Sequence, residues 1–561
     1  MLPVICLKKD FIMATEKHII KKAVIEIHVR SANNAMDLQN KALHFFKEKI
    51  CPMIEKILER YSSSGETIRI DKLELDFENF DPEYSNIDSL AKLEQEVEEK
   101  LVKLISEEKS PDFSGEIITD VKKIPKEKAD EELFLHVLKT GTLPWWAKTE
   151  GVVSLEALAQ KVIHRQSSFN SIRKDLSAAI KADAARKRIA FKLSDESVEK
   201  IISILFDSSS EQFFFIKEII AFAKENLSVS ENIRQAIYEY VLKFLTTASN
   251  LNSDLNKRLF LSGFIKEINN ISIAAKFYRS AENIAVSDKK SINANNASDE
   301  ISVLIKQALA DANEFFSDKI RKEIFSVKDV KLFFDKAENK EQLVDKKKEL
   351  ADLQEELDEK LSEKKKKLIE QQEKLNKKQE DETVLFNEEE PAEETGDYFI
   401  KNSGIIILAP YLSALFKELE LCDGKTFVSE EAKIKAVYLL QYLTTGNEEN
   451  FEEHEMVLNK ILCGLKISTP LVLPVSISEK EKEECNNLLQ AVATNWHALK
   501  GTSGEGMRDA FFIRDGILEQ QSNGWNLKIE RTTIDILLDR LPWGISIIQM
   551  PWSAEMIFVT W

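Results

Sequence analysis

The chain has 561 residues, of which 43% are hydrophobic and 31% charged, and its formal net charge is −18. A single ordinary core cannot organise so long a chain, so we expect about two to four domains. The acidic balance argues against a general nucleic-acid binder, which needs a basic face to meet phosphates. No run of about 18 apolar residues exists, so we predict no membrane-spanning helix.

The cysteines indicate neither a disulfide framework nor a zinc site. Their number is odd and none forms a CxxC pair: Cys6, Cys51, Cys422, Cys463 and Cys485. Scattered thiols of this kind fit a reducing compartment such as the cytosol. The opening MLPVICLKKDFIM lacks a convincing cleavage site, so we predict no signal peptide. Either Met1 or Met13 can serve as the start.

The first predicted module covers residues 1–125 and alternates strands with helices. The stretch KKAVIEIHVR repeats apolar residues with period two, which is typical of a strand. Helical spacing or strand alternation then predicts a helix over 35–61, a bulged strand over 67–80 and a helix over 89–107. Together these elements make a β-α-β-α unit. The polar stretch 108–128 is predicted to be a linker.

A helical region is predicted over 126–335, followed by a charged segment over 336–400. The helical region is amphipathic but shows no clean repeat period. In the charged segment, leucines recur at seven-residue spacing: Leu343, Leu350 and Leu357, then Leu361, Leu368 and Leu375. One interpretation is a coiled coil through which copies self-associate. The other is a solvated single helix or partly disordered linker, since lysines occupy several seam positions.

The last predicted module covers 401–561 and contains helices followed by strands. Helices are expected in GIIILAPYLSALFKELEL, in EEAKIKAVYLLQYLTTG, and over 452–463 and 478–499. Strands are expected in WNLKIE, GISIIQM and EMIFVTW, with Trp525, Leu527 and Ile529 on one face. The predicted fold class is therefore α+β, multidomain and mainly helical, with small β-containing modules at both ends.

One internal similarity links the two halves of the chain. The segment LFLHVLKTG, ending at Gly141, aligns without gaps on YLLQYLTTG, ending at Gly446. Both segments are predicted to be helix ends stopped by glycine. The tripeptide LPW also occurs twice, soon after Gly141 and again at 541–543.

No catalytic constellation stands out, so we predict that the chain is not an enzyme and holds no cofactor or metal. Ser503 lies in GTSGEG, where Glu505 occupies the place at which a nucleophile elbow needs glycine. That segment is expected to be an ordinary loop rather than an anion-binding turn. His497 is expected to be a surface or core histidine rather than a ligand or base. Phosphate-loop and dinucleotide-binding glycine motifs are absent.

Aromatic residues near turns are the most informative feature of the sequence. Several tryptophans without catalytic neighbours suit a protein whose work is contact with other proteins. Each can instead anchor the core, which is the commoner role of tryptophan in turns. The candidate interaction or core-anchor residues are Pro144, Trp145, Trp146, Trp525, Trp543, Trp552 and Trp561. The EMIFVTW strand is expected to belong to a sheet.

Both ends of the chain resemble the tape measure protein family of contractile injection systems. The likeness covers about 17–150 and 400–561 and rests on the order and number of the matching pieces. The N-terminal pieces are HIIKKAVIEIHV, IRIDKLELDF and LKTGTLPWWAK; the C-terminal pieces include GIIILAPYLSALF, KAVYLLQYLTTG, NKILCGL, NWHALKGTSGEGMRDAFFIRDGIL, DILLDRLPW and MPWSAEMIFVTW.

The resemblance implies a structural protein of a phage-tail-like particle that sets the length of the inner tube. It implies inner tube and baseplate subunits as partners, assembly in the cytoplasm, and a place within the particle after release. No enzymatic residues come with the family. Two alternatives stay open: an assembly or capping factor that binds tube or baseplate subunits without measuring length, and an effector carried by the particle.

Overall fold

The computed structural model gives the fold of the protein in separate stretches. The residues that it describes are 5–14, 19–29, 41–61, 66–70, 87–106, 121–147, 153–165, 169–206, 211–226, 231–247, 257, 260–261, 263–264, 396–448, 451–472, 476–499 and 501–561. The chain divides into two compact units, each with most of its contacts within itself. The first combines 1–179, 183–201 and 395–561, and the second combines 180–182 with 202–394. The second unit is therefore an insertion in the first.

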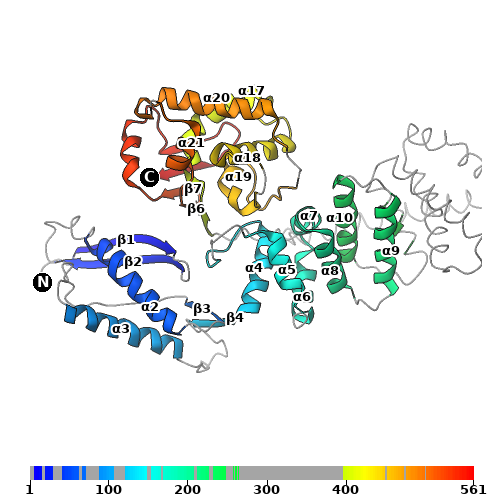
Figure 1. Ribbon diagram of the computed structural model, residues 1–561, viewed down its shortest axis with the longest axis horizontal. Helices are drawn as coiled ribbons and strands as arrows, with labels where there is room; N and C mark the ends of the chain where they lie inside the picture. Colours follow the sequence, from blue (N-terminus) through cyan, green and yellow to red (C-terminus); the bar gives the residue numbers. More distant parts are fainter. Residues whose placement is uncertain are drawn as a thin grey trace, which may run out of the picture. The chain divides into compact units, whose positions relative to one another are not determined.

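The N-terminal stretches of the first unit contain two two-stranded antiparallel sheets and two long helices (Figure 1). β1 (Ile5–Ala14) pairs with β2 (Ile19–Val29), and β3 (Glu66–Ile70) pairs with β4 (Val121–Pro125). The helices are the π-helical turn η1 (Phe46–Ile50) continued by α2 (Cys51–Tyr61), and α3 (Ile87–Ser106). A small core cluster joins them, with Ile57, Val97 and Leu101 fully buried.

The structure differs from the sequence predictions at two places in this region. β1 is a strand that was not predicted from the sequence; it precedes the predicted strand β2 and forms a hairpin with it. The predicted linker 108–128 ends in β4 and the start of the next helix, because VKKIP pairs with β3 residue by residue. The predicted helices over 35–61 and 89–107 and the predicted strand in KKAVIEIHVR are confirmed where they are described.

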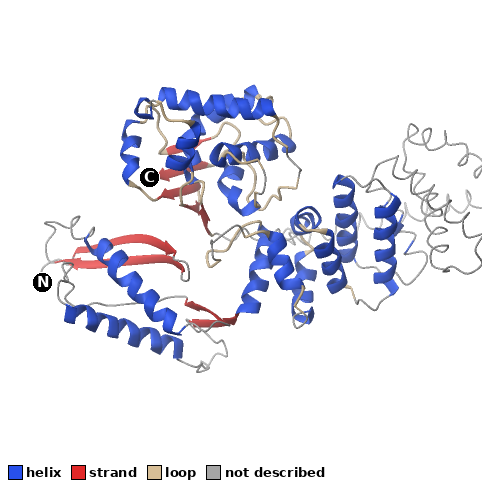
Figure 2. Ribbon diagram, in the orientation of Figure 1, coloured by secondary structure: helices blue, strands red, loops and turns tan. Residues whose placement is uncertain are grey.

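A run of helices follows β4 (Figure 2). α4 (Lys126–Thr140) packs against its three successors, α5 (Leu155–Ile163), α6 (Phe169–Ala179) and α7 (Asp183–Lys192). The remaining helices of this run are α8 (Asp195–Leu205), α9 (Glu211–Asn226) and α10 (Glu231–Thr247). The helical prediction for this region is confirmed up to Thr247. The leucine segment Leu343–Leu375, with its possible coiled coil, lies outside the described residues.

The C-terminal stretch surrounds a five-stranded sheet of order β5-β6-β7-β9-β8. Its strands are β5 (Asp397–Ile400), β6 (Gly516–Gln521), β7 (Gly524–Ile529), β8 (Ile547–Gln549) and β9 (Met556–Thr560). β9 lies parallel to β7 and antiparallel to β8, so the EMIFVTW strand is held on both sides. The predictions for β7, β8 and β9 are confirmed, and Trp525, Leu527 and Ile529 share the buried face of β7.

Helices and helical turns of this stretch cover the sheet. They are η5 (Ser403–Leu408), α17 (Ala409–Glu418), α18 (Glu430–Thr445), η6 (Glu453–Met456), α19 (Val457–Leu462), α20 (Glu479–Asn495), η7 (His497–Leu499), α21 (Gly504–Met507), η8 (Arg508–Phe512) and η9 (Thr533–Arg540). Ser478 caps α20 with a capping box, and Gly446 ends α18, as local signals predict. The mainly helical α+β fold class is thus confirmed.

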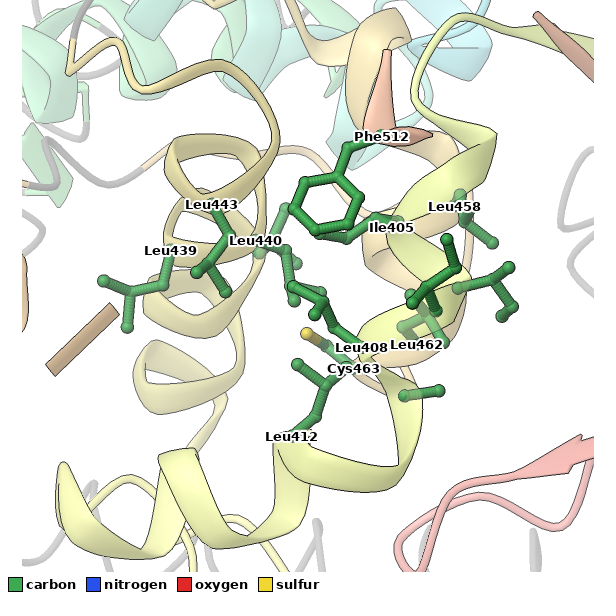
Figure 3. Packing of buried hydrophobic residues seen from close by; sticks show 14 of the residues in the cluster. Ile405, Leu408, Leu412, Leu439, Leu440, Leu443, Leu458, Leu462, Cys463 and Phe512 are labelled. Atoms are coloured by element: carbon green, nitrogen blue, oxygen red, sulfur yellow. The ribbon is translucent and has the colours of Figure 1, made fainter. Parts of the chain in front are cut away.

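The core of the C-terminal stretch is built mostly from leucine and isoleucine. Figure 3 shows its centre, where the side chains of α18 meet those of η5, α17, α19 and η8. The labelled residues are Ile405, Leu408, Leu412, Leu439, Leu440, Leu443, Leu458, Leu462, Cys463 and Phe512. Gly404 allows η5 to approach η8, because a Cβ atom there would overlap the backbone of Phe511. This core fixes α18 and α19, which carry or flank the site described next.

Candidate functional site

A buried ion cluster joins two distant stretches of the first unit. We call Arg188, Glu453 and Lys460 the ion cluster. Arg188 Nε and Nη2 donate to the two carboxylate oxygens of Glu453, at 2.9 and 2.7 Å. Lys460 Nζ donates to Glu453 Oε1 at 2.6 Å. Side-chain exposure is only 1% for Arg188 and Lys460 and 7% for Glu453.

Backbone carbonyls complete the coordination of both cations. Arg188 Nη1 donates to the carbonyl oxygens of Leu138 at 3.1 Å and Lys139 at 2.8 Å, in the last turn of α4. Its Nη2 also donates to the carbonyl oxygen of Ser468 at 2.7 Å, and Lys460 Nζ donates to that of Ile467 at 2.7 Å. A cation suits the C-terminal end of a helix, where carbonyl groups concentrate negative charge. The cluster is therefore satisfied although water is excluded from it.

The pKa values of the cluster follow from burial and from charge. Burial disfavours the ionised carboxylate, but Lys460 and Arg188 outweigh it and hold the pKa of Glu453 at about 2. Burial lowers the pKa of Lys460 to about 8, because attraction to Glu453 offsets only part of the cost of desolvating the ammonium group. The neighbouring His454 is also affected by burial, which lowers its pKa to about 4. Glu453 is therefore ionised and His454 neutral at pH 7.

Gly141 makes room for the cluster where α4 ends. Its φ of 73° is left-handed, and its N–H donates to Val137 O at 2.8 Å. A Cβ atom at this position would overlap Glu453 Oε1 and Arg188 Nη2. Glycine is thus required at position 141 for two reasons, the left-handed backbone angle and the close approach of the ion pair.

The similarity between the segments ending at Gly141 and Gly446 extends to three dimensions. Gly446 has φ 74°, and its N–H donates to Tyr442 O at 2.7 Å. In each segment the threonine before the glycine donates to the carbonyl four residues earlier, at 2.8 Å for Thr140 and 2.9 Å for Thr445. Arg508 Nε donates to Leu443 O at 3.1 Å, the position equivalent to the Leu138 carbonyl that Arg188 contacts. Both segments are helix ends stopped by glycine, as predicted.

Two further contacts connect the helices α5 and α7 to the C-terminal stretch. The Leu155 N–H donates to Glu452 Oε2 at 3.4 Å. Lys192 Nζ donates to the hydroxyl of Tyr438 at 3.5 Å. Together with the ion cluster, these bonds link 126–192 to 438–468, on the two sides of the insertion. We call this set of contacts the cross-insertion interface.

The first three of the candidate interaction or core-anchor residues lie in the turn after α4. Pro144, Trp145 and Trp146 are half-buried. The guanidinium carbon of Arg69, on β3, lies 3.8 Å from the centre of the Trp146 ring, a close cation–π contact. The turn comes shortly after Gly141 in the chain, and it contacts the β3–β4 sheet through Trp146.

The other four predicted residues lie within the C-terminal stretch, and each indole nitrogen donates a hydrogen bond. The acceptors are Glu555 Oε2 for Trp525 (2.8 Å), Ile407 O for Trp543 (3.0 Å), Leu462 O for Trp552 (2.8 Å) and Asp535 Oδ2 for Trp561 (3.2 Å). Trp525 is buried and the other three are half-buried. These tryptophans tie the sheet, the helices and η9 together. Among the described residues, none of them forms a ring contact or a hydrogen bond with Trp145 or Trp146.

The residues that were considered as possible catalytic groups or metal ligands make ordinary structural contacts. The Ser503 hydroxyl accepts from the Gly506 N–H at 3.1 Å and caps α21. His497 is exposed, and its Nδ1 lies 3.1 Å from Asn495 O. Among the described residues, no three His, Cys, Asp or Glu side chains gather as a metal ion requires. The four cysteines with described side chains, Cys51, Cys422, Cys463 and Cys485, are buried thiols.

The sequence predictions did not identify the ion cluster. Its partners are far apart in the chain, and each looks like an ordinary charged residue in isolation. One signal was present: Lys460 interrupts the apolar helix VLNKIL, whose other residues are all buried. A charge at such a position needs a buried partner. Within the described residues, no helix combines the length and apolarity needed to cross a membrane.

Comparison with known proteins identifies the family. Searches with the chain match no curated protein and no solved structure. The sequence model of one family, described as contractile injection system tape measure protein, matches residues 17–561. Tape measure proteins are structural and non-enzymatic, in agreement with the prediction that the chain is not an enzyme. The match covers nearly the whole sequence, so the chain belongs to the contractile injection system tape measure protein family.

Proposed function

We propose that the protein sets the length of the inner tube of a contractile injection particle during assembly. The family match over 17–561 carries this proposal. The architecture supports it, because a folded unit made of both ends of the chain carries a long insertion, 202–394. A length-setting protein needs a part that docks and a part whose length can vary, and the two units supply such a pair.

The partners in this proposal are the inner tube and baseplate subunits of the particle. The protein would meet them in the cytoplasm of the producing cell and stay inside the particle after release. Its net charge of −18 would complement a basic tube lumen. The half-buried turn Pro144–Trp146 is the proposed contact residue set, whereas Trp525, Trp543, Trp552 and Trp561 are proposed as core anchors. Self-association through Leu343–Leu375 and the four-part domain division stay predictions.

Tube length in particles tests the proposal directly. About 28 residues between Leu343 and Leu375 are deleted in one strain and duplicated in another, and tube lengths are measured by electron microscopy. Tubes that shorten and lengthen in step with the chain support length setting. Intact particles with unchanged tubes contradict it.

An assembly or capping factor is the second candidate function. It is favoured by the cross-insertion interface, which holds the first unit together without residues of the insertion. Unchanged tube length in intact particles is the result expected from such a factor. A carried effector is tested separately: alanine at His497 or Ser503 would abolish its activity while particles still assemble.

A further inference from the structure

Each of the two helix ends stopped by glycine holds an arginine, and the two arginines have matching surroundings. Arg188 packs against Gly141 and Arg508 against Gly446, so closely that a Cβ atom at either glycine would crowd the guanidinium group. Each guanidinium group also donates to the carbonyl oxygen of the residue three positions before its glycine. Because the carbonyl end of a helix attracts a cation, the end of α18 holds Arg508 as the end of α4 holds Arg188.

The two sites differ in what faces the rest of the guanidinium group. Arg188 Nε and Nη2 donate to the carboxylate of Glu453, whereas Arg508 forms no ion pair with any described residue. Arg508 Nη2 is buried and has no hydrogen-bond partner among the described residues. The guanidinium carbon lies 5.6 Å from the centre of the Tyr442 ring, and this contact supplies no oxygen acceptor. A buried donor without an acceptor is unfavourable, so this edge of Arg508 calls for one.

The acidic residues close to Arg508 in the described part of the chain do not supply that acceptor. Glu448, just after the end of α18, pairs with Lys482 at 2.6 Å. Glu505 and Asp509, on either side of Arg508 in the sequence, are exposed and form no ion pair with it. The carboxylate that would complete the second site therefore does not come from the described residues.

We propose that Arg508 is a receptor for a carboxylate side chain of a partner protein, which docks at the end of α18 as Glu453 docks at the end of α4. A planar guanidinium group matches a carboxylate through two parallel hydrogen bonds, and Nη2 is a donor left for one of them. Arg508 is half-buried, so the partner would complete its burial as Glu453 completes that of Arg188.

The charges around Arg508 specify the chemistry of the partner. Glu505 and Asp509 lie within three positions of Arg508 and are exposed, so they repel further acidic groups and attract basic ones. The partner surface that fits therefore presents one aspartate or glutamate among lysine or arginine side chains. Only the identity of the partner rests on the proposed function, which names the inner tube and baseplate subunits.

The first experiment tests the chemistry of the site with a simple carboxylate. The melting temperature of the full chain is measured in increasing sodium propionate, with sodium chloride added to keep the ionic strength constant. Propionate bound at Arg508 stabilises the folded protein. We expect the melting temperature to rise by about 1–2 °C at a propionate concentration several times its dissociation constant.

Matched variants show whether this rise comes from Arg508. Arg508→Gln should abolish the rise. Arg508→Lys, which keeps the charge without the planar fork, should reduce it and serves if the glutamine variant does not fold. Arg540→Gln removes an exposed arginine from η9 and should leave the rise unchanged. An equal rise in the wild type and in Arg508→Gln, or no rise in the wild type, overturns the carboxylate site.

The second experiment tests the partner. The full chain is immobilised, and its binding of purified inner tube and baseplate subunits of the same particle is followed by surface plasmon resonance. We expect Arg508→Gln to weaken the binding of one subunit by about tenfold or more, and Arg540→Gln to leave it unchanged. Glu505→Gln and Asp509→Asn should weaken it less, and mainly at low salt, because they act through exposed charges. Equal affinity of the wild type and Arg508→Gln overturns the partner contact.

Amide substitutions in the bound subunit locate the carboxylate. Each exposed aspartate or glutamate of the subunit is changed to its amide, alone and together with Arg508→Gln. One of them should weaken binding as Arg508→Gln does, with little further loss when the two are combined. Losses that add for every combination overturn the pairing. If the wild type binds neither subunit, the partners named in the proposed function are wrong, while the propionate series still decides whether Arg508 binds a carboxylate.

Discussion

Arg188 and Glu453 are 265 positions apart in the chain, yet they form a buried two-point salt bridge in which both carboxylate oxygens accept from one guanidinium group. Removing one partner of such a pair leaves a buried charge without compensation, which costs roughly 3–5 kcal/mol. We expect Glu453→Gln to lower the unfolding free energy of the first unit by about this amount, measured by urea denaturation. Arg531→Gln, at an exposed pair with Asp539, should change it by less than about 1 kcal/mol. Similar losses for both variants would contradict a special role of burial.

Stability should fall as the pH decreases from about 6.5 to about 2. Two buried groups, His454 and Glu453, have folded pKa values below their ordinary values, about 4 for His454 and about 2 for Glu453. The unfolded chain therefore binds more protons than the folded one in this range, and acid favours unfolding. Glu453 alone accounts for roughly 3 kcal/mol, present above pH 4.5 and lost as the pH falls towards 2.

Two variants separate the pH ranges of these groups. His454→Gln should flatten the dependence between pH 6.5 and 4, and Glu453→Gln should flatten it between pH 4.5 and 2. Both are checked by thermal unfolding at a series of pH values. A dependence that neither variant alters would show that other groups control acid unfolding.

Gly141→Ala should destabilise the protein more than Gly501→Ala. Both glycines have left-handed backbones, with φ of 73° and 88°, so each alanine costs about 1 kcal/mol in backbone strain. Only at position 141 does the new methyl group also collide with Glu453 and Arg188, whereas nothing lies within 4 Å at position 501. The melting temperatures of the two variants measure the difference. Equal melting temperatures would mean that the cluster shifts without cost.

Deletion of 556–561 should unfold the C-terminal stretch, since β9 is bonded to β7 on one side and to β8 on the other. The deletion also removes the Trp561 indole, which donates to the buried Asp535. Near-ultraviolet circular dichroism and thermal melting report the loss of tertiary packing. Trp561→Phe, which removes only the hydrogen bond, should cost about 1 kcal/mol. Unchanged melting of the truncated chain would refute the prediction.

Elements with a strong local pattern could be predicted from the sequence. α18 and α20 carry their own end signals, Gly446 and Ser478. β7 alternates buried and less buried residues from Trp525 to Ile529, so its periodicity is visible without knowledge of the sheet. Local signals of this kind depend only on residues that are neighbours in the sequence, so they can be recognised without knowing which distant residues they contact.

The strands missed from the sequence depend on their neighbours. β4 is polar, and its pairing with β3 is what makes it a strand. β6 reads GILEQQ, which contains little alternation, although the Asn523–Gly524 pair that follows is a hairpin signal. Only Lys460 left a signal of the ion cluster in the sequence. The partners of Lys460 could not be predicted, because the geometry of the cluster depends on the packing of α4, α7 and α19.

The wide separation of Arg188 and Glu453 also has a consequence for synthesis. A ribosome adds roughly 5–20 residues per second, so Arg188 waits some tens of seconds for its partner to emerge. During that time α4 and α7 exist without the stretch that covers them, and the guanidinium group stays hydrated. The first unit can close only after the insertion has left the ribosome, at the loop-closure entropy of a long chain. A nascent chain in this state exposes surface that becomes buried only when the unit closes.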